Sequence, residues 1–142
     1  MFLKQEHGGS AVEFALVLPV LVVLIFGIVE LGLALYDKAV ITNASREGAR
    51  TGILFKKPPV TDDEIRSVVN NYCQNKLVTF GLDKSVTTDI DYDDRNSDGI
   101  RNTDDALTVA VAFKYDYLVL PGFISALTGG INMNATTVMR ME

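Results

Sequence analysis

The sequence predicts an α+β protein: a long N-terminal helix that enters a membrane, followed by a small domain of one helix on a three-stranded antiparallel sheet. Two observations carry this prediction. Phe14 to Val29 is a run of sixteen residues without a charge, which is typical of a membrane-spanning helix. After Gly81 the apolar pattern changes from a helical period to strict alternation, which indicates strands. At 142 residues the chain has room for one compact domain and an appendage.

The long helix has the length that a bilayer requires. As a helix, Phe14 to Ala34 would run about 31 Å, close to the thickness of the hydrocarbon core. Glu30 alone interrupts this run with a charge, near its far end, where a carboxylate can reach the interface. Pro19 lies inside the run and can bend the helix. No breaker follows until Pro58, so the helix is expected to continue beyond the membrane to about Ala49.

Two other interpretations of this segment are a buried helix of a soluble protein, which would need a larger domain around it than the remaining residues can easily provide, and a cleaved secretory signal. Gly32-Leu33-Ala34 weakly matches a small-x-small cleavage site. However, the apolar run is long for a signal, and Glu13 would be unusual within one. Membrane entry is therefore the favoured interpretation.

The soluble part is predicted to begin with a capped helix. Thr61 and Glu64 stand at capping-box spacing and predict a helix from Thr61 to Thr79, ended by Gly81. Cys73 lies beside the apolar face of this helix, which favours a small core side chain over a reactive thiol.

Three segments with alternating apolar residues follow and predict three strands, each with one buried face. They are Val86–Tyr92, Leu107–Tyr115 and Ile131–Met141. The apolar stretch between the second and third strands is expected to pack as core, with a short helical turn at Phe123–Leu127; an exposed contact surface for a partner is the alternative.

Composition argues against several classes of function. The net charge of −5 and the pI near 4.8 argue against a nucleic-acid partner, which would require a basic face. His7 is the single histidine and Cys73 the single cysteine. An intrachain disulfide, a His/Cys metal centre and a Cys–His or Ser–His active site therefore cannot be assembled within this chain. We do not expect an enzyme.

The segment DRNSDGIRNTDD, between the first two predicted strands, has the spacing of a calcium loop. Its oxygen-bearing side chains alternate, Gly99 permits the sharp bend, and hard oxygen ligands suit Ca²⁺ better than zinc. The closing position of the loop holds Asp where Glu is usual. The flanking segments are predicted strands and not helices, so a bound ion would hold together a β-hairpin and the loop would not be a true EF-hand. An ordinary acidic turn is an equal alternative. The predicted ligands are Asp94, Asn96, Asp98, the Ile100 carbonyl and Asp105.

The N-terminal motif GGSAVEF resembles the cleavage site of type IV pilin-like precursors. In that family a membrane-embedded prepilin peptidase cuts after a glycine on the cytoplasmic side. The cut would fall between Gly8 and Gly9, which makes Glu13 the fifth residue of the mature chain, followed by Phe14. A cut after Gly9 would make Glu13 the fourth residue and fits worse.

The resemblance narrows further to the TadE-like minor pilins (pseudopilins) of tight-adherence, or Flp, pili. It rests on AVEFALVLPVLVVLIFGIVELG and NASREGAR, within residues 8 to 52, and faintly on the closing TTVMRME. It implies a bacterial inner-membrane protein that crosses once and carries its C-terminal domain outside the cytoplasm. It also implies a role in adhesion pili and contacts with membrane lipid, prepilin peptidase, other pilins and the assembly platform. The expected division is a leader at 1–8, the long helix at 9–56, embedded to about residue 34, and a soluble domain at 57–142.

The resemblance implies that Glu13 has a role in subunit assembly. A carboxylate in hydrocarbon costs at least about 2.5–3.5 kcal/mol, and pairing with the freed amino terminus of a neighbouring subunit would offset that cost. This pair requires cleavage, because an uncut chain has no amine at Gly9. The alternative is that Glu13 reaches the headgroups alone.

Two features depart from the family's pattern. The leader MFLKQEHG is poor in basic residues, and Lys and Arg are more frequent after the apolar run than before it, which by the positive-inside rule alone would place the C-terminal part in the cytoplasm. The peptidase motif demands a cytoplasmic leader, and we follow it. An uncleaved single-pass anchor that presents a calcium-dependent binding domain is the competing function. Entry into the fibre or retention in the membrane stays open.

Overall fold

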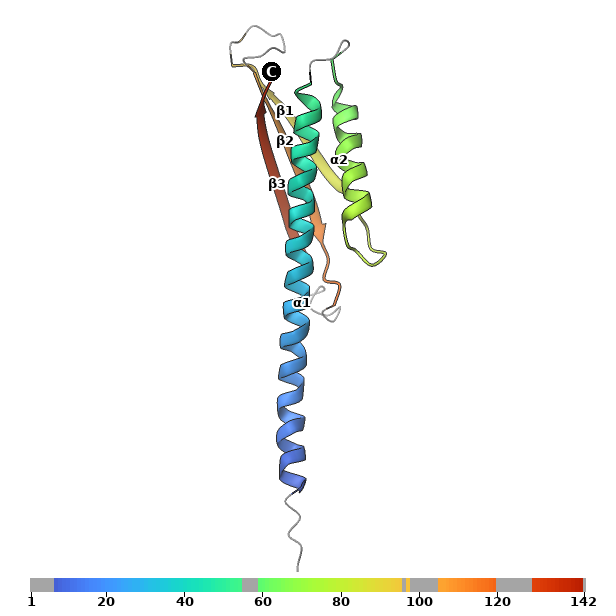
Figure 1. Cartoon of the computed structure of the whole chain (residues 1–142), viewed down its shortest axis with the longest axis vertical. Coiled ribbons are helices and arrows are strands. Elements are labelled where there is room, and N and C mark those ends of the chain that lie inside the picture. Colours follow the sequence, from blue (N-terminus) through green and yellow to red (C-terminus); the bar gives the residue numbers. More distant parts are fainter. Residues whose placement is uncertain (1–6, 55–58, 96, 98–104, 120–128, 142) are drawn as a thin grey trace, which may run out of the picture.

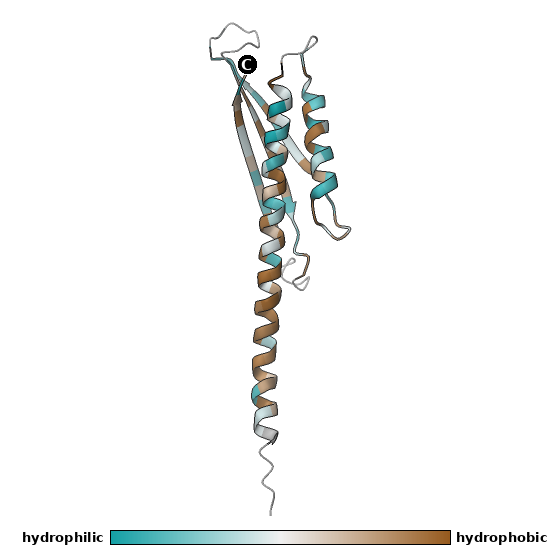
Figure 2. Cartoon of the chain, in the orientation of Figure 1, coloured by the Kyte–Doolittle hydropathy of each residue, from teal (hydrophilic) through white to brown (hydrophobic). Residues whose placement is uncertain are grey.

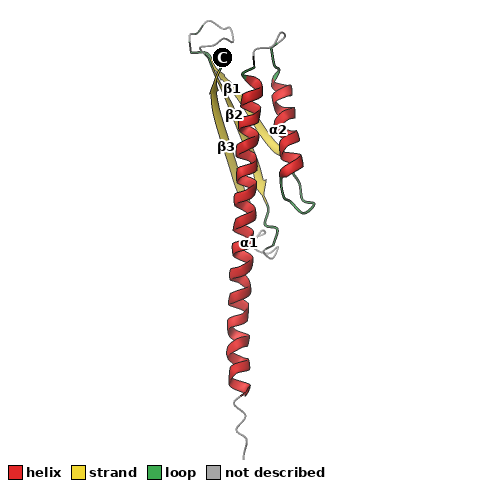
Figure 3. Cartoon of the chain, viewed as in Figure 1, coloured by secondary structure: helices red, strands yellow, loops and turns green. Residues whose placement is uncertain are grey.

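The computed structural model describes residues 7–54, 59–95, 97, 105–119 and 129–141. Within these residues, two helices precede three strands (Figures 1 and 3). Their bounds are α1 His7–Gly52, α2 Asp62–Lys76, β1 Val86–Asp93, β2 Ala106–Tyr115 and β3 Ile131–Arg140. The predicted α+β layout is confirmed. The short turn expected at Phe123–Leu127 lies outside the described residues.

α1 has two halves with different surroundings. From Gly9 to Val29 its residues are exposed, except for half-buried Gly27, and Figure 2 shows this half as an almost unbroken apolar rod that projects from the domain. α1 is long and apolar enough to cross a membrane, and its most apolar window is not buried by any described part of the chain. From Glu30 onward α1 packs against the rest of the molecule. The helix continues through Pro19.

The three strands form one antiparallel sheet in the order β1-β2-β3. The register pairs Val109 of β2 with Ile90 of β1 and Thr137 of β3. Along β1, half-buried residues alternate with exposed ones, because one face of the sheet is covered and the other is open.

α1 and α2 run side by side in opposite directions and cover the inner face of the sheet (Figure 1). α1 lies over β2 and β3, and α2 lies near β1. The core forms between these layers from small and branched side chains. Its members include Ile41, Ala44 and Ala49 of α1, Ile65, Val69 and Cys73 of α2, and Leu107, Val109, Val111 and Phe113 of β2.

Two glycines let α1 approach its neighbours closely. A Cβ at Gly48 would lie 2.6 Å from Cγ2 of Val69, and one at Gly52 would lie 2.7 Å from Cδ1 of Ile65. Both distances are too short for real Cβ contacts, so glycine sets the spacing of α1 from α2.

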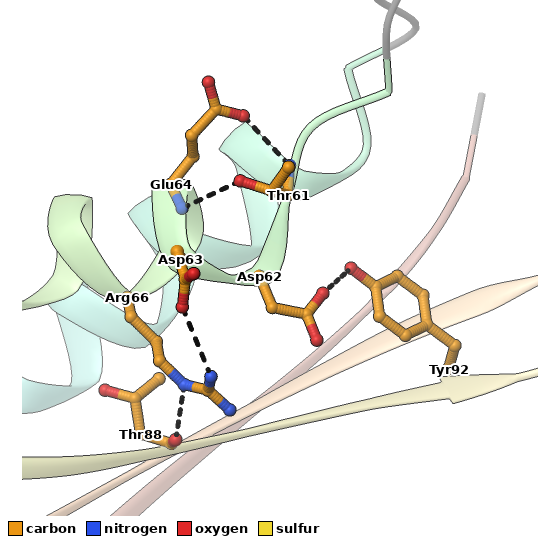
Figure 4. A network of polar contacts seen from close by, with 7 residues as sticks. All are labelled: Thr61, Asp62, Asp63, Glu64, Arg66, Thr88 and Tyr92. Carbon is orange, nitrogen blue, oxygen red and sulfur yellow. Dashed lines mark hydrogen bonds and ion pairs between the residues drawn. The ribbon is translucent and has the colours of Figure 1, made fainter.

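The start of α2 has the predicted capping box. The Thr61 hydroxyl accepts from the Glu64 amide at 3.3 Å, and the Glu64 carboxylate accepts from the Thr61 amide at 2.9 Å. Figure 4 shows how the same turn is tied to β1: Tyr92 donates to Asp62 at 2.9 Å, and Arg66 donates to the Thr88 carbonyl at 3.5 Å. The cap therefore also fixes the helix against the sheet.

α2 ends at Lys76, three residues before the predicted end at Thr79. The Leu77 amide still bonds to Cys73, but Leu77 itself is extended. The next amide, that of Val78, donates to Oδ1 of Asp37 on α1 at 3.0 Å, so a contact distant in sequence takes the donor that would have continued the helix. Cys73 is fully buried, as predicted.

Candidate functional site

The residues of the predicted cleavage and assembly motif lie in the first turns of α1. Gly9, Glu13 and Phe14 are exposed, and no described atom lies within 4 Å of the position that a Cβ at Gly9 would take. Gly8 lies within the helix. Gly9 and Glu13 are four residues apart and therefore fall on the same side of the helix, one turn apart.

Glu13 has no partner within the described part of its own chain. No described residue forms a hydrogen bond or ion pair with it, and its neighbours Val12 and Phe14 are 62% and 63% exposed. Whatever covers this turn of α1 lies outside the described chain.

Glu30 marks the point where the domain begins to cover α1, and it is only 2% exposed. Its Oε1 accepts from the Tyr115 hydroxyl at 2.5 Å and from the Leu118 amide at 2.9 Å, and its Oε2 accepts from the Val119 amide at 2.7 Å. Burial and the bond to Glu30 raise the pKa of the Tyr115 hydroxyl. The carboxylate therefore fixes the C-terminal end of β2 against α1. The sequence alone instead suggests that this carboxylate reaches the membrane interface.

Sequence reasoning missed this role of Glu30. The signal was its position as the single charge in the apolar run. Its partners could not be identified, because they lie more than 80 residues away in the chain.

A second buried carboxylate, Asp37, lies at the contact between the helices. Its side chain is fully buried; Oδ1 accepts from Val78, and Oδ2 has no partner among the described residues. Burial raises the pKa of Asp37, against the opposing effects of the Val78 amide and the charge of Lys84. Burial, with the nearby charge of Asp37, raises the pKa of the Cys73 thiol to about 11. Such a thiol stays protonated and unreactive at neutral pH.

The structure describes two of the five predicted calcium ligands. Asp94 directly follows β1 and is exposed, whereas Asp105 directly precedes β2 and is 2% exposed. Because Asp93 and Ala106 are paired, the two aspartates stand at the base of the same hairpin. The remaining candidates, Asn96, Asp98 and Ile100, lie outside the described residues. Among the described residues, no three His, Cys, Asp or Glu side chains are grouped as a metal site.

A family model matches the N-terminal part of the chain. No curated protein and no solved structure matches the chain. Residues 8–50 match the family model described as TadE-like protein. This match spans the exposed rod and most of the buried half of α1, including Glu13, Glu30 and Asp37. TadE-like proteins are pilin-like components associated with tight-adherence pili, so the resemblance predicted from the motif is confirmed over residues 8–50, about a third of the chain.

Proposed function

We propose that this chain is a minor pilin, or pseudopilin, of a tight-adherence pilus or a related secretion apparatus. The observation that carries the proposal is that the TadE-like match covers the exposed apolar half of α1. The TadE-like match begins at the glycine pair, and the half of α1 that follows is an apolar rod that no described residue covers. Such a rod requires either lipid or other helices around it.

In this proposal α1 crosses the bacterial inner membrane once, and the sheet domain lies outside the cytoplasm. The exposed run from Gly9 to Val29 would extend about 30 Å along the helix axis, which suits the hydrocarbon core. Burial begins at Glu30, where polar contacts to Tyr115, Leu118 and Val119 replace lipid contact. The length of the exposed run therefore supports a membrane boundary close to Glu30.

Processing by prepilin peptidase between Gly8 and Gly9 is the first step of the proposed function. It would release residues 1–8 and create an amine one helical turn from Glu13. A neighbouring subunit's amine would then pair with this carboxylate, while apolar contacts hold the helices laterally. Glu13 has no described partner in its own chain, and this supports a partner from another subunit.

Intact-mass measurement of the membrane-extracted protein tests the processing step. With a co-expressed prepilin peptidase, the mature chain should lack Met1–Gly8 and begin at Gly9; without the peptidase it should be full length. Loss of one further glycine would indicate the cut after Gly9. A chain that stays uncut in the presence of an active peptidase would instead support the alternative, a single-pass anchor that presents the domain.

A further inference from the structure

The turn between α2 and β1 presents bulky apolar side chains to the outside. Phe80 is 72% exposed and Leu82 is 49% exposed. Beyond residue 36, the described residues expose only two other large apolar side chains, Leu54 and Val138. Two of these four therefore gather in one four-residue turn.

The backbone of this turn is well defined and unfavourable for phenylalanine. The Leu82 amide donates to the Thr79 carbonyl at 2.9 Å, and the Thr79 hydroxyl donates to the Leu82 carbonyl at 2.9 Å. The two central residues, Phe80 and Gly81, have φ of 46° and 93°. Glycine and asparagine suit such positions, whereas a bulky residue at positive φ is an outlier. Within the described chain, nothing in the burial of Phe80 offsets this strain.

The turn lies at the end of the domain that faces the apolar half of α1 (Figure 1). Just before it, Val78 is bonded to Asp37 of α1. Thr79 and Leu82 line a small cavity together with Tyr115 and Leu118, both of which are bonded to Glu30. The turn is thus fixed at the level of α1 between Glu30 and Asp37.

This level is where the proposed transmembrane half of α1 ends. Leu35 and Tyr36 of α1, 70% and 48% exposed, lie at the same level. Aromatic and leucine side chains at this depth are typical of contact with the headgroup region. The exposed apolar residues of the turn therefore lie at the depth at which the proposed transmembrane half of α1 ends.

We propose that Phe80 and Leu82 enter the lipid headgroup region, as a second membrane contact beside α1. The occupant of this surface is the bilayer itself. The inference rests on the proposed insertion of α1. Two contacts, side by side, would fix the tilt of the domain over the membrane, which a single helix leaves free to rotate.

Single-tryptophan fluorescence tests this contact, because the chain has no tryptophan of its own. Full-length variants are reconstituted into phosphatidylcholine vesicles whose acyl chains carry bromine near the headgroup. Phe80→Trp should show blue-shifted emission and several-fold stronger bromine quenching than Leu54→Trp. Leu54 is the matched control, since it is 50% exposed and follows the opposite end of α1.

Phe26→Trp, within the apolar half of α1, separates the two proposals. Quenching of Phe26→Trp without quenching of Phe80→Trp would overturn the second contact and leave the insertion of α1 intact. If neither probe is quenched, the proposed insertion itself fails. Blue-shifted but unquenched emission from Phe80→Trp would mean that protein covers the turn, which also overturns the lipid contact.

Phe80→Asn keeps the test independent of folding, because asparagine accepts the backbone of this turn. In a Leu82→Trp background, Phe80→Asn should reduce bromine quenching of the probe severalfold while circular dichroism and thermal stability are preserved or improved. Unchanged quenching in this pair would overturn the role of Phe80.

Discussion

Glu30 is the single charged residue of the apolar run from Phe14 to Ala34, and its side chain is bonded to residues at and just after the end of β2. Its two carboxylate oxygens accept hydrogen bonds from the described residues Tyr115, Leu118 and Val119, and its side chain is 2% exposed. We expect Glu30→Ala to lower the free energy of unfolding by at least about 2 kcal/mol, because it leaves buried donors unsatisfied. Denaturation of the full chain in detergent, followed by near-ultraviolet circular dichroism of the tyrosines, measures this loss.

The matched control for this prediction is Tyr115→Phe, which removes one donor and keeps the ring. It should cost less than Glu30→Ala, and amide hydrogen exchange at Leu118 and Val119 should rise only in Glu30→Ala. Equal stability of Glu30→Ala and the unaltered chain would contradict the assigned contacts.

Asp37 should make the free energy of unfolding fall as pH rises. A carboxylate in an ion pair, whose pKa is lowered by folding, has the opposite effect. Burial raises the pKa of Asp37 in the folded chain above the ordinary value of 3.8. Between these two pKa values the folded state binds more protons than the unfolded state, so stability falls as pH rises through this window. Below pH 3.8 both states are protonated and the effect disappears.

Asp37→Asn tests this sign, since the amide oxygen can still accept from Val78. The melting temperature of the variant should exceed that of the unaltered chain by several degrees at pH 7. The difference should shrink as pH falls towards 3.8. A variant that is less stable at pH 7 would show that the charged form of Asp37 stabilises the fold.

At the scale of elements, α1 packs against α2 through glycine. Gly48→Ala should lower the free energy of unfolding by about 1–3 kcal/mol, because the added methyl would overlap Val69 in a filled core. Gly32→Ala is the matched control on the same helix, where no described atom lies within 4 Å of the new Cβ. The melting temperatures of the two variants test this prediction. An equal change in melting temperature for Gly48→Ala and Gly32→Ala would contradict the close approach of α1 and α2 at Gly48.

The β1–β2 connection carries the calcium prediction. If the loop binds Ca²⁺, millimolar Ca²⁺ should raise the melting temperature of the chain, because a ligand that binds only the folded state stabilises it. Calorimetric titration should detect heat that Asp98→Ala abolishes. Mg²⁺ at the same concentration is the control for unspecific screening of the acidic loop. Absence of heat from Ca²⁺ would leave an ordinary acidic turn.

The elements could be predicted from sequence because their signals are local. Alternation gave the three strands, and the Thr61 and Glu64 spacing gave the start of α2. The end of α2 and the role of Glu30 could not be predicted, because both depend on partners distant in the chain: Asp37 for Val78, and Tyr115 for Glu30. The Phe80 turn was hidden for the same reason, since a helix was expected to reach Thr79.

At the scale of the whole molecule, the carboxylates of Glu13, Glu30 and Asp37 on α1 differ in burial and in hydrogen bonding. Asp37 is buried with one oxygen bonded, and Glu30 is buried with both oxygens bonded. Glu13 is exposed in the apolar half, and no described residue contacts its carboxylate. The domain therefore donates hydrogen bonds to both buried acids, Glu30 and Asp37, whereas Glu13 depends, in the proposed function, on another subunit.

Glu13→Gln tests that last step. It should leave cleavage at Gly8 unaffected but reduce co-purification of the mature chain with other pilins at least about tenfold, since loss of about 1.4 kcal/mol already changes an equilibrium tenfold. Glu47→Gln is the control, because Glu47 lies on the same helix outside the apolar half and forms an exposed ion pair with Arg50 at 3.9 Å. It should assemble normally. Since glutamine inserts into lipid more easily than glutamate, reduced assembly of Glu13→Gln could not be attributed to poorer insertion. Normal assembly of the cleaved Glu13→Gln chain would refute the charge pair and leave α1 as a simple anchor.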